Sequence, residues 1–500
     1  MTDDLREAYD SVPYESHPFA QSHPDRLATL GVIFGMTPAR IEHCRVLEVG
    51  CASGGNILPL AATLPHSEFV GIDFSQVQIE RGRADVRALA LSNVRLESMD
   101  IMQLDDNLGE FDYIVAHGVY SWVPSSVQEK LLAVCADHLA ANGIAYISYN
   151  TLPGWNMRAT VRAAMRYHTR QVRDPQVRVQ QARGVLDLLA QFARGEEIGY
   201  ASMLRAEAAE VRDKADYYVF HEHLEEVNEA FYFHDFIERA SSHGLRYLAE
   251  ANFSHMFTTD LPAAANQAIA RLAPDLITRE QLIDFLRNRT FRQTLLVHDE
   301  VALERKVSPL RVASLRAASR ARPVREKIEA TDAPEEFRTP DDRRIAVASA
   351  LAKTAFMILA DAWPRCIAFD ELLSTAASAT NTAAGEAARG MLASALLSAY
   401  AAGVIELHYA APVFTLEPGA RPQAGRLQRL HAQRGREITT LRHEELKVDA
   451  TTRQLLVLMD GLRTRDEIAD QAWPGLPHEQ RRRLLAEALP QLARQALLIA

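Results

Sequence analysis

The alternation of apolar runs and amphipathic stretches over the first 150 residues constrains the fold of this chain more than any other feature. Five short apolar runs have the residue types and length of strands, and helical patterns separate most of them. Strands that alternate with helices predict a parallel sheet covered by helices on both faces. The expected strands are 45–50, 68–73, 94–100, 111–117 and 143–149, and the expected helices are 56–64, 76–90 and 126–139.

The pattern changes after residue 155, and 500 residues are too many for one ordinary domain. From there to about residue 300 the chain carries few strand signals, which predicts a separate helical domain. Three later helices followed by a ribbon of strands, 404–409 and 412–416, suggest a winged-helix-like module. The expected domains are an α/β domain at 1–155, a helical domain at 156–325, a winged-helix-like domain at 341–418 and a small helical domain at 424–500.

A glycine-rich loop, 48–56, follows the first expected strand and opens the first helix. Glycines let a ligand approach the backbone, and a helix N-terminus offers free N–H groups. Nicotinamide enzymes use a similar loop, so the loop alone does not identify the ligand. Three acids favour S-adenosylmethionine. Glu48 precedes the first glycine by two residues, and Asp73 and Asp100 follow the next two strands, where carboxylates can accept from ribose hydroxyls and from the adenine amino group.

Each of these features also has a structural alternative. Asp73 can cap the helix that starts near Ser75, Asp100 can be a turn residue, and a glycine-rich turn can occur without a ligand. Their combination is more specific, because an open parallel sheet binds ligands at the carboxyl ends of its strands. The sequence therefore predicts that Gly50, Asp73 and Asp100 share one adenosyl-binding pocket.

Several motifs around this loop resemble one family. The order E-x-G-C-x-S-G, V-G-I-D and F-D-Y-I is similar to the Rossmann-like class I S-adenosylmethionine-dependent methyltransferases. The segments 9–19, 22–27, 117–124 and 148–155 resemble a group that includes bacterial protein-lysine methyltransferases of the rickettsial type, and 221–236 resembles the helical methyltransferase regulatory domain of that group. The group also carries C-terminal winged-helix-like modules. Ser22 instead of threonine and Ala52 instead of the middle glycine are departures from the common pattern.

The resemblance implies a set of site residues. The cofactor is expected to lie against Glu48, Gly50, Cys51, Ala52, Ser53, Asp73, Phe74, Asp100, Ile101, His117 and, from an N-terminal flap, Tyr14. Catalytic and substrate-channel groups are expected at His117, Tyr120, Trp122, Tyr149, Asn150 and Trp155. Packing beneath a lid is an equally good interpretation of each aromatic side chain. A backbone contact is a better expectation for His117 than general-base chemistry.

No metal site is expected. His221, Glu222 and His223 are adjacent in sequence, so they point to different faces of a helix. The four cysteines form no CxxC pair, which favours buried thiols over a disulfide framework or a zinc site. The implied cofactor is S-adenosyl-L-methionine alone.

The resemblance implies an enzyme that N-methylates lysine side chains of protein substrates. One alternative is a small-molecule or lipid-linked metabolite methyltransferase with the same cofactor site. Another is a cofactor-sensing winged-helix regulator. The composition of residues 341–420 argues against the regulator. This segment has five basic and eight acidic side chains, whereas phosphate binding needs a basic surface. The net charge of −10 likewise makes a nucleic-acid partner unexpected.

The sequence also predicts a cytoplasmic protein without a membrane span. The chain starts with a polar, acidic segment instead of a basic start and an apolar run. None of its uncharged stretches is an unbroken apolar run of about 20 residues. The C-terminal domains are candidate surfaces for self-association.

Overall fold

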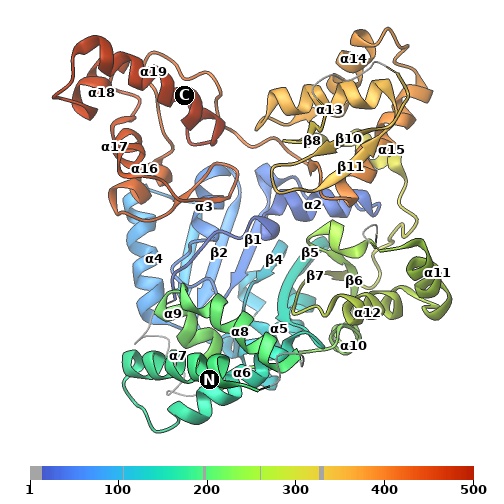
Figure 1. Ribbon diagram of the computed structural model, residues 1–500, viewed down its shortest axis with the longest axis vertical. Helices are drawn as coiled ribbons and strands as arrows, with labels where there is room; N and C mark the ends of the chain where they lie inside the picture. Colours follow the sequence, from blue (N-terminus) through green and yellow to red (C-terminus); the bar gives the residue numbers. More distant parts are fainter. Residues whose placement is uncertain (1–13, 105, 195–198, 259–260, 326–330) are drawn as a thin grey trace.

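A seven-stranded sheet forms the centre of the computed structural model, which describes residues 14–104, 106–194, 199–258, 261–325 and 331–500 (Figure 1). The part of the predicted flap before Tyr14 lies outside the described residues. The strand order is β3-β2-β1-β4-β5-β7-β6. The strands are β1 Arg45–Val49, β2 Glu68–Asp73, β3 Val94–Ser98, β4 Phe111–Ala116, β5 Leu139–Asn150, β6 Leu245–Glu250 and β7 Phe291–His298.

Strands β1 to β5 are parallel, so their carboxyl ends lie at one edge of the sheet. Strand β7 runs antiparallel to both β5 and β6. Its first residue, Phe291, therefore pairs with Asn150 at that same edge. The parallel strands other than the edge strand β3 are largely buried on both faces because helices cover them. This arrangement confirms the predicted α/β class with a Rossmann-like sheet.

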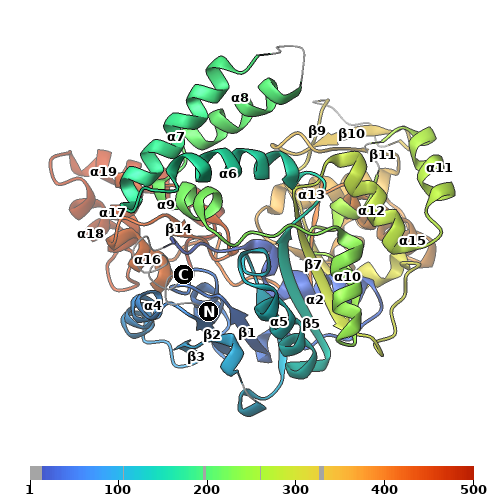
Figure 2. The same ribbon diagram turned by 90° about the horizontal axis from the view of Figure 1, so that it is seen from below.

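The helices that flank the sheet follow the expected alternation. Helix α3 packs against β2, α4 against β2 and β3, α2 and α5 against β5, and α10 against β6 (Figure 2). Ser75 starts α4, because its side chain accepts from the amide of Gln78. These helices are α2 Pro24–Ile33, α3 Ile57–Thr63, α4 Gln76–Leu89, α5 Ser125–His138 and α10 Phe233–Ser242.

The segment 156–325 differs from the almost wholly helical unit that the sequence predicts. Its first part is helical and has its own apolar core, in which Met165, Leu186 and Leu204 are buried. Strands β6 and β7, however, complete the central sheet. The two strand segments bury nearly every residue against partners far away in sequence. The helices of this segment, besides α10, are α6 Trp155–Thr169, α7 Pro175–Phe192, α8 Gly199–Arg212, α9 Asp216–Val219, α11 Ala263–Leu272 and α12 Leu276–Arg287.

Two smaller units follow, at the upper right and upper left of Figure 1. The first joins three helices to the three-stranded sheet β12-β8-β13 and also contains a second three-stranded sheet, β11-β10-β9. The expected strand at 412–416 is absent from these described residues, and β8 supplies the third strand from upstream of residue 341. The elements are β8 Arg316–Ala318, β9 Arg322–Pro323, β10 Glu335–Arg338, β11 Arg344–Val347, α13 Ala350–Ala362, β12 Ile367–Ala368, α14 Phe369–Ala379, α15 Glu386–Ala401 and β13 Glu406–His408.

The last unit has its own core and docks on the first domain. Arg434 and Arg436 both pair with Asp85 of α4, and α16 packs against α3 and α4. Its elements are α16 Arg426–Gln433, β14 Ile438–Thr439, β15 Glu445–Leu446, α17 Ala450–Leu458, α18 Arg465–Ala472 and α19 His478–Arg494. Among the described helices, none is both long enough and apolar enough to cross a membrane.

Candidate functional site

The loop after β1 turns sharply at the carboxyl edge of the sheet. Three of its residues have positive φ angles: Gly50 (74°), Ala52 (47°) and Gly54 (84°). A Cβ atom on Gly50 would stand 2.5 Å from Cγ2 of Val119, so the position accepts only glycine. The amides of Gly50 and Cys51 donate to the carbonyl oxygen of Ile72 at 2.8 and 3.1 Å. These bonds fix the loop to the end of β2.

The two predicted acids lie at neighbouring strand ends. Asp73 accepts from the backbone amide of Ala52 at 2.8 Å and from that of Ser75 at 2.8 Å, so it links the loop to the start of α4. The amide of Met99 donates to the carbonyl oxygen of Asp73 at 2.9 Å, which brings Asp100 beside it. Asp100 itself accepts from the amide of Met102 at 3.0 Å. The loop and both acids therefore lie at one edge of the sheet, and a pocket shared by them stays a prediction.

Glu48 is buried directly beneath the loop. Its Oε1 accepts from Nδ2 of Asn56 at 2.9 Å, while its Oε2 is buried without a hydrogen-bond partner among the described residues. Burial raises the pKa of Glu48 to about 8, and the nearby Asp73 carboxylate adds to the shift. An unsatisfied carboxyl oxygen below a glycine loop can interact with a cationic group placed on that loop.

An N-terminal strap, residues 14–23, crosses the loop. Ser16 Oγ accepts from the amide of Gly55 at 2.7 Å, and the amide of Phe19 donates to Asn56 Oδ1 at 2.8 Å. The carbonyl oxygen of Tyr14 accepts from Gln78 on α4. The strap therefore covers the loop from outside, and Tyr14 lies within it as the flap prediction requires.

His117 follows β4 and lies between aromatic rings. It stacks on Phe19 of the strap, with ring centroids 3.6 Å apart, and the ring of Phe291 is 5.9 Å away. Its Nδ1 is 2.8 Å from the hydroxyl of Tyr146. Burial lowers the pKa of His117 to about 3, so the ring is neutral at neutral pH.

Two of the predicted channel residues are fully buried. Tyr149 stacks on Phe236 with centroids 4.1 Å apart, and its hydroxyl is 3.1 Å from that of Thr294. Tyr120 packs edge-on against Phe236 and tilted against Phe231. In this structure both tyrosines form an aromatic core beneath the strand ends, which corresponds to the packing alternative. Their participation in a reaction stays a prediction.

Trp122 and Trp155 form a second aromatic pair, with rings 6.4 Å apart and perpendicular. Nε1 of Trp155 donates to Asn228 Oδ1 at 2.7 Å. Asn150 lies close by in sequence and is 2% exposed, and its Nδ2 has no hydrogen-bond partner among the described residues. The Asn150 side chain therefore keeps an amide group that is free to donate among the described residues.

Profiles of known families match three segments of the chain. Residues 46–143 match a methyltransferase domain, residues 215–298 match a family described as "Predicted methyltransferase regulatory domain", and residues 420–473 match the "PKMT, C-terminal winged helix domain". The last match covers part of the unit for which the sequence predicts a small helical domain.

Relatives extend the match. An uncharacterised protein of Rickettsia prowazekii is 43% identical over 60% of this chain, which spans about half (54%) of that relative's length. A second one is 42% identical over 48% of this chain and 96% of its own. The structure of PKMT2 from Rickettsia typhi superposes on this chain with a TM-score of 0.86 and 29% sequence identity. The superposition covers 97% of this chain and all of the PKMT2 chain. A second structure of that PKMT2 is a complex with AdoHcy. The chain belongs to the S-adenosylmethionine-dependent methyltransferases.

Sequence reasoning missed several side chains around the site of this methyltransferase. Asn56 holds Glu48 and the strap together, and His443 of the last unit reaches it, with Nε2 2.8 Å from Asn56 Oδ1. Phe19 covers His117, and Asn228 orients Trp155. Asn56 and Phe19 lay within motifs that the resemblance quoted, whereas no local signal marks His443, because its partner is far away in sequence.

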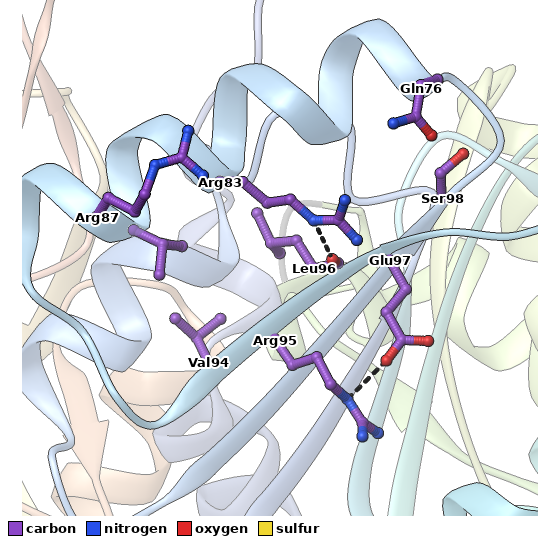
Figure 3. A pocket seen from close by; sticks show the side chains of 9 residues that line it. Gln76, Arg83, Arg87, Val94, Arg95, Leu96, Glu97 and Ser98 are labelled. Carbon is purple, nitrogen blue, oxygen red and sulfur yellow. Dashed lines mark hydrogen bonds and ion pairs between the residues drawn. The ribbon is translucent and has the colours of Figure 1, made fainter.

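A groove along the edge strand adjoins the site (Figure 3). It has a volume of about 570 Å³ and lies between α4 and β3. Arg83 donates to the carbonyl oxygen of Leu96, and Arg95 pairs with Glu97. Gln76 and Ser98 line it in the segments next to Asp73 and Asp100. The groove lies along the outer side of β3, whereas the loop, the strap and His117 gather at the strand ends.

Proposed function

We propose that this chain transfers methyl groups from S-adenosylmethionine to lysine side chains of protein substrates. The likeness to PKMT2 of Rickettsia typhi carries this proposal, because it extends over 97% of the chain at 29% identity and includes the units outside the methyltransferase domain. The general methyltransferase domain, by contrast, matches only residues 46–143. Likeness over the accessory units therefore supports a shared substrate class.

The glycine loop and the acids form the proposed cofactor site. The adenosyl part would lie against Asp73 and Phe74 at the ribose and against Asp100 and Ile101 at the adenine. The amino-acid end would lie against the loop and His117, with Tyr14 in the covering strap. The loop residues are Glu48, Gly50, Cys51, Ala52 and Ser53. The unpartnered Oε2 of Glu48 fits an ammonium group nearby.

The cofactor supplies an electrophilic methyl group on a sulfonium. The chain has to position the nucleophile and exclude water. The strap, with Phe19 stacked on His117, covers the loop and reduces solvent access. No protein group needs to form a covalent bond with the methyl group.

A lysine amine must lose its proton before it attacks. The Trp122 and Trp155 pair is bordered by two guanidinium groups, those of Arg162 and Arg158, at 5.2 and 5.4 Å from the ring centroids. Arg162 is 4% exposed. Its guanidinium donates to the backbone carbonyls of Glu222 and Glu225. A buried cation beside the proposed channel favours the neutral form of an incoming amine.

Radiolabelled methyl transfer tests the substrate class. The full chain is incubated with labelled S-adenosylmethionine and a bacterial lysate, and proteins are separated from small molecules. Label in protein that co-elutes with methylated lysine after acid hydrolysis is expected, and Asp73→Ala should abolish it. Label confined to small molecules would refute the lysine proposal and favour the metabolite alternative. Absence of transfer, with cofactor binding intact, would favour the regulator.

A further inference from the structure

The N-terminal strap has contacts beyond the glycine loop, and they come from two units outside the methyltransferase domain. His17 of the strap lies between α9 and the hairpin β14–β15, which are far apart in sequence (Figure 2). Its Nδ1 donates to Oε1 of Glu445 at 2.7 Å, and its Nε2 is 3.2 Å from the hydroxyl of Tyr217. The rings of His17 and Tyr217 also stack, with centroids 6.5 Å apart. One side chain of the strap therefore joins two separate units.

Both partners of His17 belong to the accessory units. Tyr217 lies within residues 215–298, the segment with the regulatory-domain match, and Glu445 lies within residues 420–473, the segment with the winged-helix match. The two segments thus meet at one residue of the strap that covers the glycine loop. A change in the position of either unit would act on the strap directly.

The start of the strap is held on two sides. The ring of Tyr14 packs edge-on against those of Tyr217 and His221, with centroids 5.3 and 5.8 Å apart. The carbonyl oxygen of Tyr14 accepts from Nε2 of Gln78 at 2.8 Å. The strap is therefore fixed both to the regulatory segment and to α4 of the methyltransferase domain.

The end of the strap is held by the same hairpin that supplies Glu445. His443, in the turn between β14 and β15, has its Nε2 2.8 Å from Oδ1 of Asn56, the oxygen that also accepts from the amide of Phe19. The rings of His23 and His443 meet edge-on, with centroids 5.3 Å apart. The hairpin thus contacts the strap at two points, and His17 is the point that also reaches the regulatory segment.

Between these points the strap lies directly on the glycine loop. Ser16 Oγ accepts from the amide of Gly55 at 2.7 Å, and a Cβ atom on Gly55 would stand 2.3 Å from the carbonyl oxygen of Ser16. Phe19 stacks on His117 from the same side. The amino-acid end of the cofactor is proposed to lie against the loop and His117, so its release requires the strap to lift.

We infer that His17 is a positioning residue that latches the strap over the cofactor, so that the regulatory segment and the last unit together set the rate of cofactor release. The latch consists of His17, Tyr217 and Glu445. The inference rests on the proposed cofactor site and is independent of the methyl acceptor. The hydrogen bonds of the His17 ring go to the two accessory units, so this residue acts through the strap.

Charge strengthens the latch below the pKa of His17. The hydrogen bond to Glu445 raises the pKa of His17 above its ordinary value of 6.5, burial opposes the shift, and the carboxylates of Glu15 and Glu437 add to it. A protonated His17 pairs with a carboxylate, and this pair is lost as the pH rises through the raised pKa. The other titratable groups around the pair are Tyr14, Tyr217, His431 and Lys447.

The rate of cofactor release tests the inference without a methyl acceptor. The full chain is loaded with tritiated S-adenosylmethionine, an excess of the unlabelled compound is added, and the retained label is followed by rapid filtration. His17→Ala should raise the dissociation rate constant about tenfold, because it removes the contacts to both units. Glu445→Gln and Tyr217→Phe each weaken one contact and should raise it about threefold.

Glu444→Gln is the matched control. Glu444 is the residue before Glu445, but it pairs with Arg442 of its own unit at 3.5 Å, so release should stay at the wild-type rate. The double variant of His17→Ala and Glu445→Gln should release the cofactor no faster than His17→Ala alone, since both changes remove the same pair. An unchanged rate in His17→Ala, or effects of the two changes that multiply, would overturn the inference and leave lysine methylation standing.

Two further measurements separate a latch from a contact that only supports the fold. Release from wild type should become faster as the pH rises above 6.5, and Glu445→Gln should show a flatter profile. In hydrogen exchange followed by mass spectrometry, peptides that cover residues 14–23 should exchange faster in His17→Ala than in wild type. Identical pH profiles in wild type and Glu445→Gln, or faster exchange of the strap at an unchanged release rate, would refute the latch.

Discussion

Replacement of Asp73 by asparagine should weaken cofactor binding strongly while leaving the fold intact. Both carboxylate oxygens of Asp73 accept from backbone amides, those of Ala52 and Ser75, each at 2.8 Å. The proposed ribose hydroxyls add two further donors. Asparagine keeps the size of the side chain but turns one acceptor into a donor, which then faces the amide of either Ala52 or Ser75.

The loss can be estimated from these bonds. A hydrogen bond to a charged group contributes about 1.5–3 kcal/mol, so weakening both ribose contacts should cost about 3 kcal/mol of binding free energy. The dissociation constant of S-adenosylmethionine should therefore rise about a hundredfold. Isothermal titration calorimetry on the purified chain measures this directly.

Asp112→Asn provides the matched control. Asp112 also accepts from a backbone amide, that of Arg45, at 2.8 Å, but at the start of β1, the opposite edge of the sheet. Asp73→Asn should lose about 1–3 kcal/mol of stability from the disturbed amide, and Asp112→Asn should lose less, because its remaining amide oxygen can still accept from Arg45. Only Asp73→Asn should lose cofactor affinity. Equal affinity in the two variants would refute the ribose assignment, and unfolding of Asp73→Asn alone would mean that its role is structural.

Three further predictions follow from the same contacts. Gly50→Ala should weaken cofactor binding more than tenfold because its Cβ would meet Val119. Gly244 is the control, since it has the same φ of 74° but open space where a Cβ would stand. Gly244→Ala should cost only about 1 kcal/mol of stability, measured by thermal unfolding. His443→Ala should lower cofactor affinity about three- to tenfold by freeing Asn56, and His443→Gln should restore part of it; unchanged calorimetric affinity in His443→Ala would show that the last unit does not support the loop. Burial lowers the pKa of His117 from 6.5 to about 3, so the unfolded chain binds one more proton than the folded chain between these pH values. The free energy of unfolding should therefore fall as the pH drops from 6.5. His117→Gln should show a shallower fall, measured by urea titrations.

The sequence was most informative where a local pattern carries the structure. The period of apolar residues predicts the strands β1 to β5 and the helices between them, because burial on both faces of a parallel sheet requires continuous apolar runs. The predicted glycine-rich loop follows β1, and its Gly50 and Gly54 have the positive φ angles that glycine tolerates. Asp73 and Asp100 follow strands that pair in parallel, so their proximity follows once the strand order is known.

The strands β6 and β7 show where local patterns fail. Each lies among helices, and the segment between residues 155 and 300 has mostly helical composition. Their pairing with β5 and with each other joins residues such as Asn150 and Phe291 that are far apart in sequence. Strand propensity depends on such partners, and a pattern within one short segment does not reveal them.

The sequence by itself determined the class of the sheet, the glycine loop and the acids at its edge, because each is a property of a few neighbouring residues. Only the tertiary structure decided what surrounds them: Asn56 between Glu48 and His443, and Phe19 over His117. The reason is physical. Backbone conformation follows from local sterics and from the period of burial, whereas side-chain contacts across hundreds of residues depend on how whole units pack.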